Sequence, residues 1–211
     1  MRMLVFGDSI AQGYYDIERG GWVSLLFLDV LARKVRHTDY PTELFNVSVS
    51  GDTTKRITAR LEAEASARKW ADEPVLLIFA VGINDTLLDN GQPLSSPEQY
   101  ADDLKELYAV ASKITDQLFF VGLTSVDEAE SAPWKFNTGS HELSWRNDRI
   151  AKFDAVLQSF ADQKRVGYVP VFEHFQERQA AGDILHADGL HPSAAGHRLI
   201  YEQVKQYLAG Y

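Results

Sequence analysis

The chain opens with an apolar run that breaks at a tight turn, Met3-Leu4-Val5-Phe6-Gly7-Asp8-Ser9-Ile10-Ala11-Gln12-Gly13. An apolar run that stops at glycine indicates a buried strand, here residues 3–6, followed by a turn. Functional side chains of parallel α/β proteins collect where strands end, so a catalytic serine is expected in such a turn, and Ser9 occupies it. A serine in this position also caps helices, and the turn by itself leaves both roles open.

Four further apolar runs predict strands at residues 43–47, 75–81, 118–123 and 166–171. Segments with helical periodicity separate them, at residues 22–36, 54–69, 97–114, 150–160, 173–180 and 193–208. The run at 75–81 is apolar throughout, which is typical of a central parallel strand covered on both faces. Pro170, near the end of the last run, favours an edge position. The alternation predicts one α/β domain over residues 1–211, with a five-stranded parallel sheet between two layers of helices.

Polar segments that contain glycine follow the predicted strands. Because the carboxyl ends of parallel strands open on one edge of a sheet, we expect Ser9, Gly51 and Asn84 to lie close together. The polar connection from residue 124 to about residue 139 carries Trp134 and Phe136. It is longer than the ~12–15 residues above which loops of compact domains are usually functional or disordered.

The composition excludes several classes of function. The 211 residues carry a net charge of −9 and no cluster of Lys and Arg, which argues against nucleic acid or an anionic membrane as a partner. There is no cysteine, so disulfides, thiolate metal ligands and cysteine nucleophiles are excluded. The sequence begins without a charged-then-apolar leader, and no apolar run approaches the ~20 residues of a membrane-spanning helix. We therefore expect a soluble, cytoplasmic protein without an integral membrane segment.

A serine nucleophile needs a general base, and the chain has six histidines that could serve as one. His191 follows Asp188 by three residues and precedes Pro192. This spacing suits a carboxylate that holds the imidazole by Nδ1, so that Nε2 faces a nucleophile. Two other interpretations stay open: a helix start capped by Ser193, and a metal site formed by His186, Asp188 and His191, for which the sequence shows no further ligand. The other histidines are predicted to be surface residues (His37, His141) or structural residues (His174, His197).

Four short sequence motifs, here called blocks, follow one another along the chain. They are Gly7-Asp8-Ser9-Ile10, the segment 46–54 with Gly51, Gly82-Ile83-Asn84-Asp85, and Asp188-Gly189-Leu190-His191-Pro192. In this order they resemble the SGNH hydrolases of the GDSL esterase/lipase group, and they cover nearly the whole chain. Two positions depart from the family pattern, Ile10 in place of leucine and Ser48 where many members carry glycine.

The resemblance implies a three-layer α/β/α sandwich of flavodoxin-like topology and a hydrolase that needs no metal or other cofactor. It implies that Ser9 attacks an ester carbonyl while His191 accepts its proton and Asp188 orients the imidazole. It also implies an oxyanion hole made by the backbone N–H groups of Ser9 and Gly51 and the side-chain amide of Asn84.

The substrate expected from the resemblance is a small-molecule carboxylic ester: a small-acyl ester, a lysophospholipid-like ester or a thioester. Trp134 and Phe136 are the candidate substrate-binding residues, as a lid or acyl wall, with packed loop aromatics as the alternative. A carbohydrate O-deacetylase of the same fold is the second hypothesis. The third is a flavodoxin-like protein that binds an anion or nucleotide in the 7–13 turn, which leaves Asp188 and His191 without a role. Asp8 is predicted to bond the turn backbone and Trp22 to lie in the core. Thr53 and Thr54 are predicted to cap the next helix, with a place in the lining of the site as the alternative.

Overall fold

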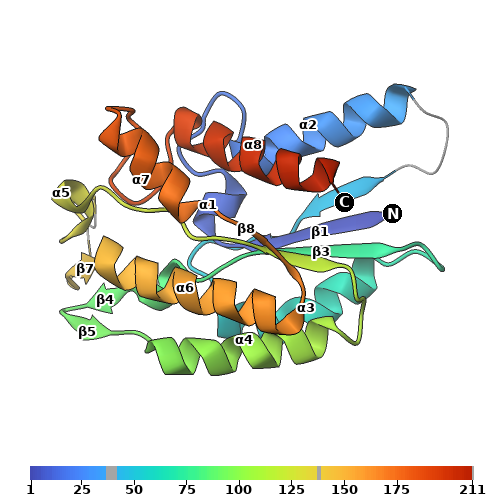
Figure 1. The fold of residues 1–211 in the computed structure, drawn as a ribbon, viewed down its shortest axis with the longest axis horizontal. Coiled ribbons are helices and arrows are strands. Elements are labelled where there is room, and N and C mark those ends of the chain that lie inside the picture. Colours follow the sequence, from blue (N-terminus) through green and yellow to red (C-terminus); the bar gives the residue numbers. More distant parts are fainter. Residues whose placement is uncertain (37–41, 137–138, 211) are drawn as a thin grey trace.

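The computed structural model describes residues 1–36, 42–136 and 139–210, and Figure 1 shows them as a sheet between two layers of helices. The sheet has five parallel strands in the order β2-β1-β3-β6-β8. Their bounds are Arg2–Gly7 (β1), Glu43–Asn46 (β2), Val75–Ala80 (β3), Leu118–Val121 (β6) and Gly167–Val169 (β8). The predicted α/β sandwich with a flavodoxin-like strand order is therefore confirmed.

Helices cover both faces of the sheet (Figure 1). On one face lie α2 (Gly21–Arg36) and α8 (Ala194–Ala209), which pack against each other. On the other face lie α3 (Thr54–Arg68), α4 (Pro97–Ala111) and α6 (Asn147–Lys164). The remaining helices are α1 (Ser9–Gln12), the 3₁₀ turn η1 (Asn84–Thr86), α5 (Glu128–Ser131) and α7 (Phe172–Ala180). In the part of the chain that the structure describes, none of these helices combines the length and apolar character needed to cross a membrane.

The local sequence explains why these elements form. The residues of β3 from Val75 to Phe79 are all buried, as expected for a strand covered on both faces. Helix α4 begins at Pro97, and the side chain of its N-cap, Ser96, accepts a hydrogen bond from the backbone N–H of Gln99. The predicted edge position is confirmed, because β8 is the last strand of the sheet and ends just before Pro170.

The structure also contains a second, antiparallel sheet that the sequence analysis did not predict. It has the order β5-β4-β7 and consists of two-residue strands, Leu88–Asp89 (β4), Gln92–Pro93 (β5) and Leu143–Ser144 (β7). Within the predicted connection 124–139, the described residues contain the helix α5, and β7, which follows that connection, pairs with β4. Strands of two residues have no periodicity to read, so sequence patterns cannot reveal them.

Candidate active site

The serine turn is held by its own backbone. Ser9 is the first residue of α1, directly after β1, and the carboxylate of Asp8 accepts a hydrogen bond of 2.9 Å from the N–H of Ile10. This confirms the structural role predicted for Asp8. A Cβ atom on Gly7 would lie 2.5 Å from the Cβ of Ala11 and 2.8 Å from the carbonyl oxygen of Ala80. Because no side chain fits there, glycine lets the turn approach the neighbouring strand β3 closely.

A chain of short contacts links the two ends of the polypeptide at this turn. The Oγ atom of Ser9 lies 2.9 Å from Nε2 of His191, and Nδ1 of His191 lies 2.7 Å from Oδ2 of Asp188. The other carboxylate oxygen of Asp188 accepts the backbone N–H groups of Leu190 (3.0 Å) and His191 (2.7 Å). Ser9, Asp188 and His191 are all buried. Residues that stand 182 positions apart thus meet in one hydrogen-bonded row.

The electrostatics of this row favour proton transfer from the serine. Burial opposes ionisation of Asp188, but the hydrogen bonds donated by His191 outweigh burial and hold the pKa of the carboxyl below its ordinary value. An ionised carboxylate only accepts hydrogen bonds, so Nδ1 of His191 carries the proton and Nε2 presents its lone pair to the hydroxyl of Ser9. A distance of 2.9 Å is within reach for general-base catalysis.

The three donors predicted for the oxyanion hole belong to three separate segments. The N–H of Ser9 is at the first position of α1, where no intrahelical acceptor exists. Gly51 sits in an exposed turn with a φ of +77°, a left-handed conformation that favours glycine. The side-chain Nδ2 of Asn84, at the start of η1, donates to the carbonyl oxygen of Asp52 at 3.0 Å. A primary amide has a second N–H, so this bond fixes Asn84 while one donor remains to be used.

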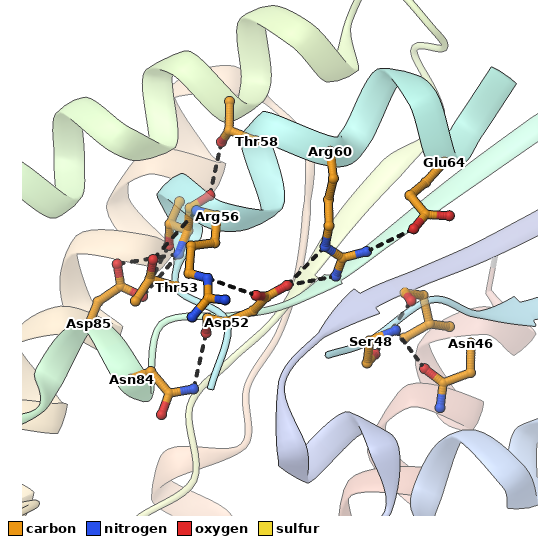
Figure 2. Close-up of polar contacts among 12 residues, drawn as sticks. Asn46, Ser48, Asp52, Thr53, Arg56, Thr58, Arg60, Glu64, Asn84 and Asp85 are labelled. Carbon is orange, nitrogen blue, oxygen red and sulfur yellow. Dashed lines mark hydrogen bonds and ion pairs between the residues drawn. The ribbon is translucent and has the colours of Figure 1, made fainter. Parts of the chain in front are cut away.

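Figure 2 shows the charged side chains that hold the loop between β2 and α3, which contains Asp52. Asp52 is buried, and its carboxylate accepts a 2.9 Å hydrogen bond from Nε of Arg60 and lies 3.4 Å from Nε of Arg56. The guanidinium of Arg60 also lies 5.5 Å from the ring centroid of Phe6, so it joins the loop to the core strand β1. No sequence pattern predicts this pair, since Asp52 and Arg60 are eight positions apart. The pair holds the backbone of Asp52, which in turn orients the amide of Asn84.

A second brace joins the loops that follow β2 and β3 (Figure 2). The carboxyl of Asp85 accepts the backbone N–H of Thr54 at 3.1 Å and its hydroxyl at 3.3 Å. Burial raises the pKa of Asp85 to about 7. The predicted capping role is confirmed for Thr53, whose Oγ1 accepts the N–H of Arg56 at the start of α3. Thr54 instead binds Asp85, one residue past Asn84.

Aromatic rings surround the imidazole of His191. The ring centroids of Tyr14, Tyr15 and Trp134 lie 5.7, 5.2 and 6.0 Å from that of His191, and we call these three residues the aromatic collar. The indole N–H of Trp134 donates to the carbonyl oxygen of Asp188 at 3.1 Å. Phe136 is 51% exposed. Substrate binding by Trp134 and Phe136 stays a prediction, and the two tyrosines of the collar were missed because nothing in a Tyr-Tyr pair reveals its distance from a histidine far along the chain.

Of the other histidines, His141 is exposed and His197 is buried, as predicted, whereas the side chain of His174, predicted to be structural, is 39% exposed. The Nε2–H groups of His186 and His197 donate to the carbonyl oxygens of Ser125 (2.7 Å) and Tyr14 (2.9 Å). Burial lowers the pKa of both histidines, which keeps them neutral. His141 is exposed beside Asp89, His174 lies on α7 at 3.7 Å from Glu177, and His37 lies outside the described residues. Across residues 1–36, 42–136 and 139–210, no three His, Cys, Asp or Glu side chains are grouped to hold a metal ion.

A hydroxyl, an imidazole and a carboxylate linked in this way at the carboxyl edge of a parallel sheet define the class of protein, a hydrolase that works through a serine. Residues 5–199 match the model of the GDSL-like lipase/acylhydrolase family, and the chain belongs to that family. The resemblance seen in the four sequence blocks is thereby confirmed. As a member of the family, the protein is a carboxylic-ester hydrolase.

Known proteins match over almost the full length. Esterase TesA of Pseudomonas aeruginosa is 26% identical over 202 residues, which cover 96% of this chain and 85% of that protein. A crystal structure of TesA is 24% identical with a TM-score of 0.68, covering 99% of this chain and 98% of the other. A member of the lipolytic G-D-S-L family from Veillonella parvula is 17% identical with a TM-score of 0.73 and the same coverage. Axe2, an acetyl xylan esterase of Geobacillus stearothermophilus, is 18% identical with a TM-score of 0.71, covering 97% and 93%. These solved structures share the fold.

Proposed function

We propose that Ser9, His191 and Asp188 form the catalytic triad of this esterase. The observation that carries the proposal is the unbroken row of contacts from Oγ to Nε2 (2.9 Å) and from Nδ1 to Oδ2 (2.7 Å). In the first half-reaction, Oγ of Ser9 bonds to the ester carbonyl carbon while Nε2 of His191 takes the hydroxyl proton. Asp188 holds the resulting imidazolium by its Nδ1–H.

Collapse of the tetrahedral intermediate breaks the bond between the carbonyl carbon and the alcohol oxygen. The imidazolium of His191 gives its Nε2 proton to the departing oxygen, and an acyl group stays on Ser9. Water then attacks the acyl-enzyme with His191 again as base, which releases the acid and restores the hydroxyl. We propose that the N–H groups of Ser9 and Gly51 and the amide of Asn84 bind the oxyanion in both half-reactions.

The substrate class that we propose is a small-molecule carboxylic ester, including small-acyl, lysophospholipid-like and thioester compounds. The likeness to an esterase supports this class, and the likeness to an acetyl xylan esterase keeps a carbohydrate O-deacetylase as the second candidate. Membership of a lipase/acylhydrolase family disfavours the anion-binding protein, which has no use for Asp188 and His191. A panel of acetyl, octanoyl and palmitoyl esters and an acyl-CoA ranks these substrates.

The triad is tested with the variant Ser9→Ala and a p-nitrophenyl ester of butyric acid. We expect turnover to fall to the level of the uncatalysed reaction, while the thermal unfolding curve keeps its cooperative shape. The matched control is Ser159→Ala, because Ser159 is exposed on α6 and distant in sequence from the blocks of the site. Full turnover by a folded Ser9→Ala protein would refute the proposal. The expected cytoplasmic location stays a prediction that cell fractionation tests.

A further inference from the structure

The alcohol half of an ester substrate has to approach one particular atom of this site. If Ser9, His191 and Asp188 act as proposed, the proton that leaves with the alcohol comes from Nε2 of His191. Proton transfer requires the alcohol oxygen within about 3 Å of that nitrogen. The groups that flank the imidazole are therefore the groups that the alcohol half contacts. The carbonyl oxygen points the other way, toward the donors proposed at Gly51 and Asn84.

The flank of the imidazole is aromatic. Asp188 occupies Nδ1 of His191 and Ser9 faces Nε2, while the rings of the collar lie 5.2–6.0 Å from the imidazole centroid. Trp134 is partly buried and is tied to the backbone of Asp188. Tyr14 and Tyr15 are 44% and 47% exposed, so a large part of each ring meets solvent directly beside the imidazole.

The two tyrosines stand on a built loop. The buried carboxylate of Asp16 accepts the N–H groups of Arg19 (3.1 Å) and Gly21 (3.2 Å), which closes the loop between α1 and α2. The ring of His197, on α8, donates to the carbonyl oxygen of Tyr14 at 2.9 Å. These bonds hold the backbone that carries the two rings before any ligand arrives, which lowers the entropy cost of ordering the loop on binding.

The conformation of Tyr15 points to the same conclusion. Its φ is +68°, a left-handed conformation that non-glycine residues seldom adopt and that is concentrated at functional sites. Burial, followed by the negative charge of Asp188, raises the pKa of the phenol. The strained backbone thus places Tyr15 beside the imidazole of His191 and leaves about half of the residue exposed, at 47%.

We propose that Tyr14 and Tyr15 form the subsite for the alcohol half of the ester, and that this subsite selects alcohols carrying a ring with an apolar face. Such a ring, from an arylmethyl alcohol or from the C–H face of a pyranose, stacks on the exposed tyrosines while its ester oxygen meets Nε2 of His191. A linear alkyl alcohol has no face to stack. This inference rests on the proposed function, since it takes His191 as the group that protonates the leaving alcohol.

The test compares esters that differ on one side only. The alcohol series is hexyl butyrate, benzyl butyrate and methyl 6-O-butyryl-glucopyranoside, and the acyl series is benzyl acetate, butyrate and octanoate, all followed by acid release in a pH-stat. The variants are Tyr14→Leu, Tyr15→Leu and the double variant, which keep apolar bulk and remove the ring face. The control is Trp70→Leu, because Trp70 is an exposed aromatic that follows α3 and precedes β3, at the opposite end of the strands from Ser9.

We expect the double variant to lower kcat/KM for one or both ring-bearing alcohols about tenfold, the scale of an aromatic contact of ~1.4 kcal/mol. Hexyl butyrate is expected to change by less than twofold, and the loss with benzyl esters is expected to be equal for all three acyl chains. The benzyl and glucosyl arms tell an aryl preference from a sugar preference.

Equal losses for all alcohols, or a loss that grows with acyl-chain length, would overturn the inference. Cooperative thermal unfolding of each variant separates loss of the subsite from loss of the fold. The proposed function is refuted by a different result, full turnover by a folded Ser9→Ala protein. That result does not depend on the outcome of the alcohol series.

Discussion

Replacement of Asp188 by asparagine tests how the triad works. The variant keeps an oxygen for the N–H groups of Leu190 and His191, so the loop that carries the histidine is preserved. It removes the negative charge that lies 2.7 Å from Nδ1 of His191. An amide N–H facing Nδ1 also forces the ring proton onto Nε2, where it blocks acceptance of the proton of Ser9.

The size of the effect follows from the same distance. At the 2.7 Å separation and an effective dielectric constant of about 20, a carboxylate and an imidazolium attract each other by about 6 kcal/mol. The imidazolium exists only once the proton of Ser9 has moved, so the attraction lowers the barrier and not the energy of the free enzyme. At about 1.4 kcal/mol for each factor of ten, kcat is expected to fall by about 10⁴.

The assay is steady-state hydrolysis of the p-nitrophenyl ester together with urea unfolding. Asp102→Asn is the matched control, because Asp102 is exposed on α4 and pairs only locally with Lys105 at 2.7 Å. We expect full activity from the control and a folded, nearly inactive Asp188→Asn protein. A folded variant that loses less than tenfold in kcat would refute this account of the triad.

Three further predictions concern the surroundings of the triad. Asn84→Ala removes one proposed oxyanion donor and is expected to lower kcat by about 10²–10³, measured with the same ester, whereas an unchanged kcat would exclude Asn84 from the hole. Arg60→Met leaves the buried carboxylate of Asp52 with Arg56 alone and is expected to cost about 3 kcal/mol in urea unfolding; a stability equal to wild type would contradict the bracing role. Burial raises the pKa of Asp8 from 3.8 to about 7, so between these pH values the native protein keeps a proton that the unfolded chain has released. The contribution of Asp8 to the free energy of unfolding is therefore greatest below pH 3.8 and is lost as pH rises through about 7. Asp8→Asn abolishes that dependence, so its unfolding free energy relative to wild type is expected to be higher at pH 8 than at pH 5, and a difference independent of pH would refute the assignment.

Sequence patterns predicted the structure best where the structure is repetitive. Apolar runs such as 75–81 predict buried parallel strands because a strand covered on both faces needs apolar side chains at every position. Ser9, Gly51 and Asn84 could be assigned to one edge because strand ends in a parallel sheet share a direction. The blocks of the family then supplied the roles proposed for them.

Sequence patterns could not predict contacts between segments that are distant in the chain. The bond from Arg60 to Asp52 and the approach of Tyr15 to His191 depend on how helices and loops pack, and neither leaves a periodic trace in the chain. The small sheet that pairs β4 with β7 was missed for the same reason. Side chains that define the shape of a site are thus harder to predict than the side chains that react in it.

In the proposed mechanism, the hydroxyl of Ser9 is the nucleophile and His191 activates it. The direct measurement is inactivation by a p-nitrophenyl alkylphosphonate, in which the serine oxygen displaces p-nitrophenolate from phosphorus and forms a stable bond. Mass spectrometry of the digested protein is expected to show one phosphonyl group, on the peptide containing Ser9, and labelling is expected to be lost in His191→Ala. A label on another residue would show that Ser9 is not the nucleophile, and undiminished labelling without His191 would show that this histidine does not activate it.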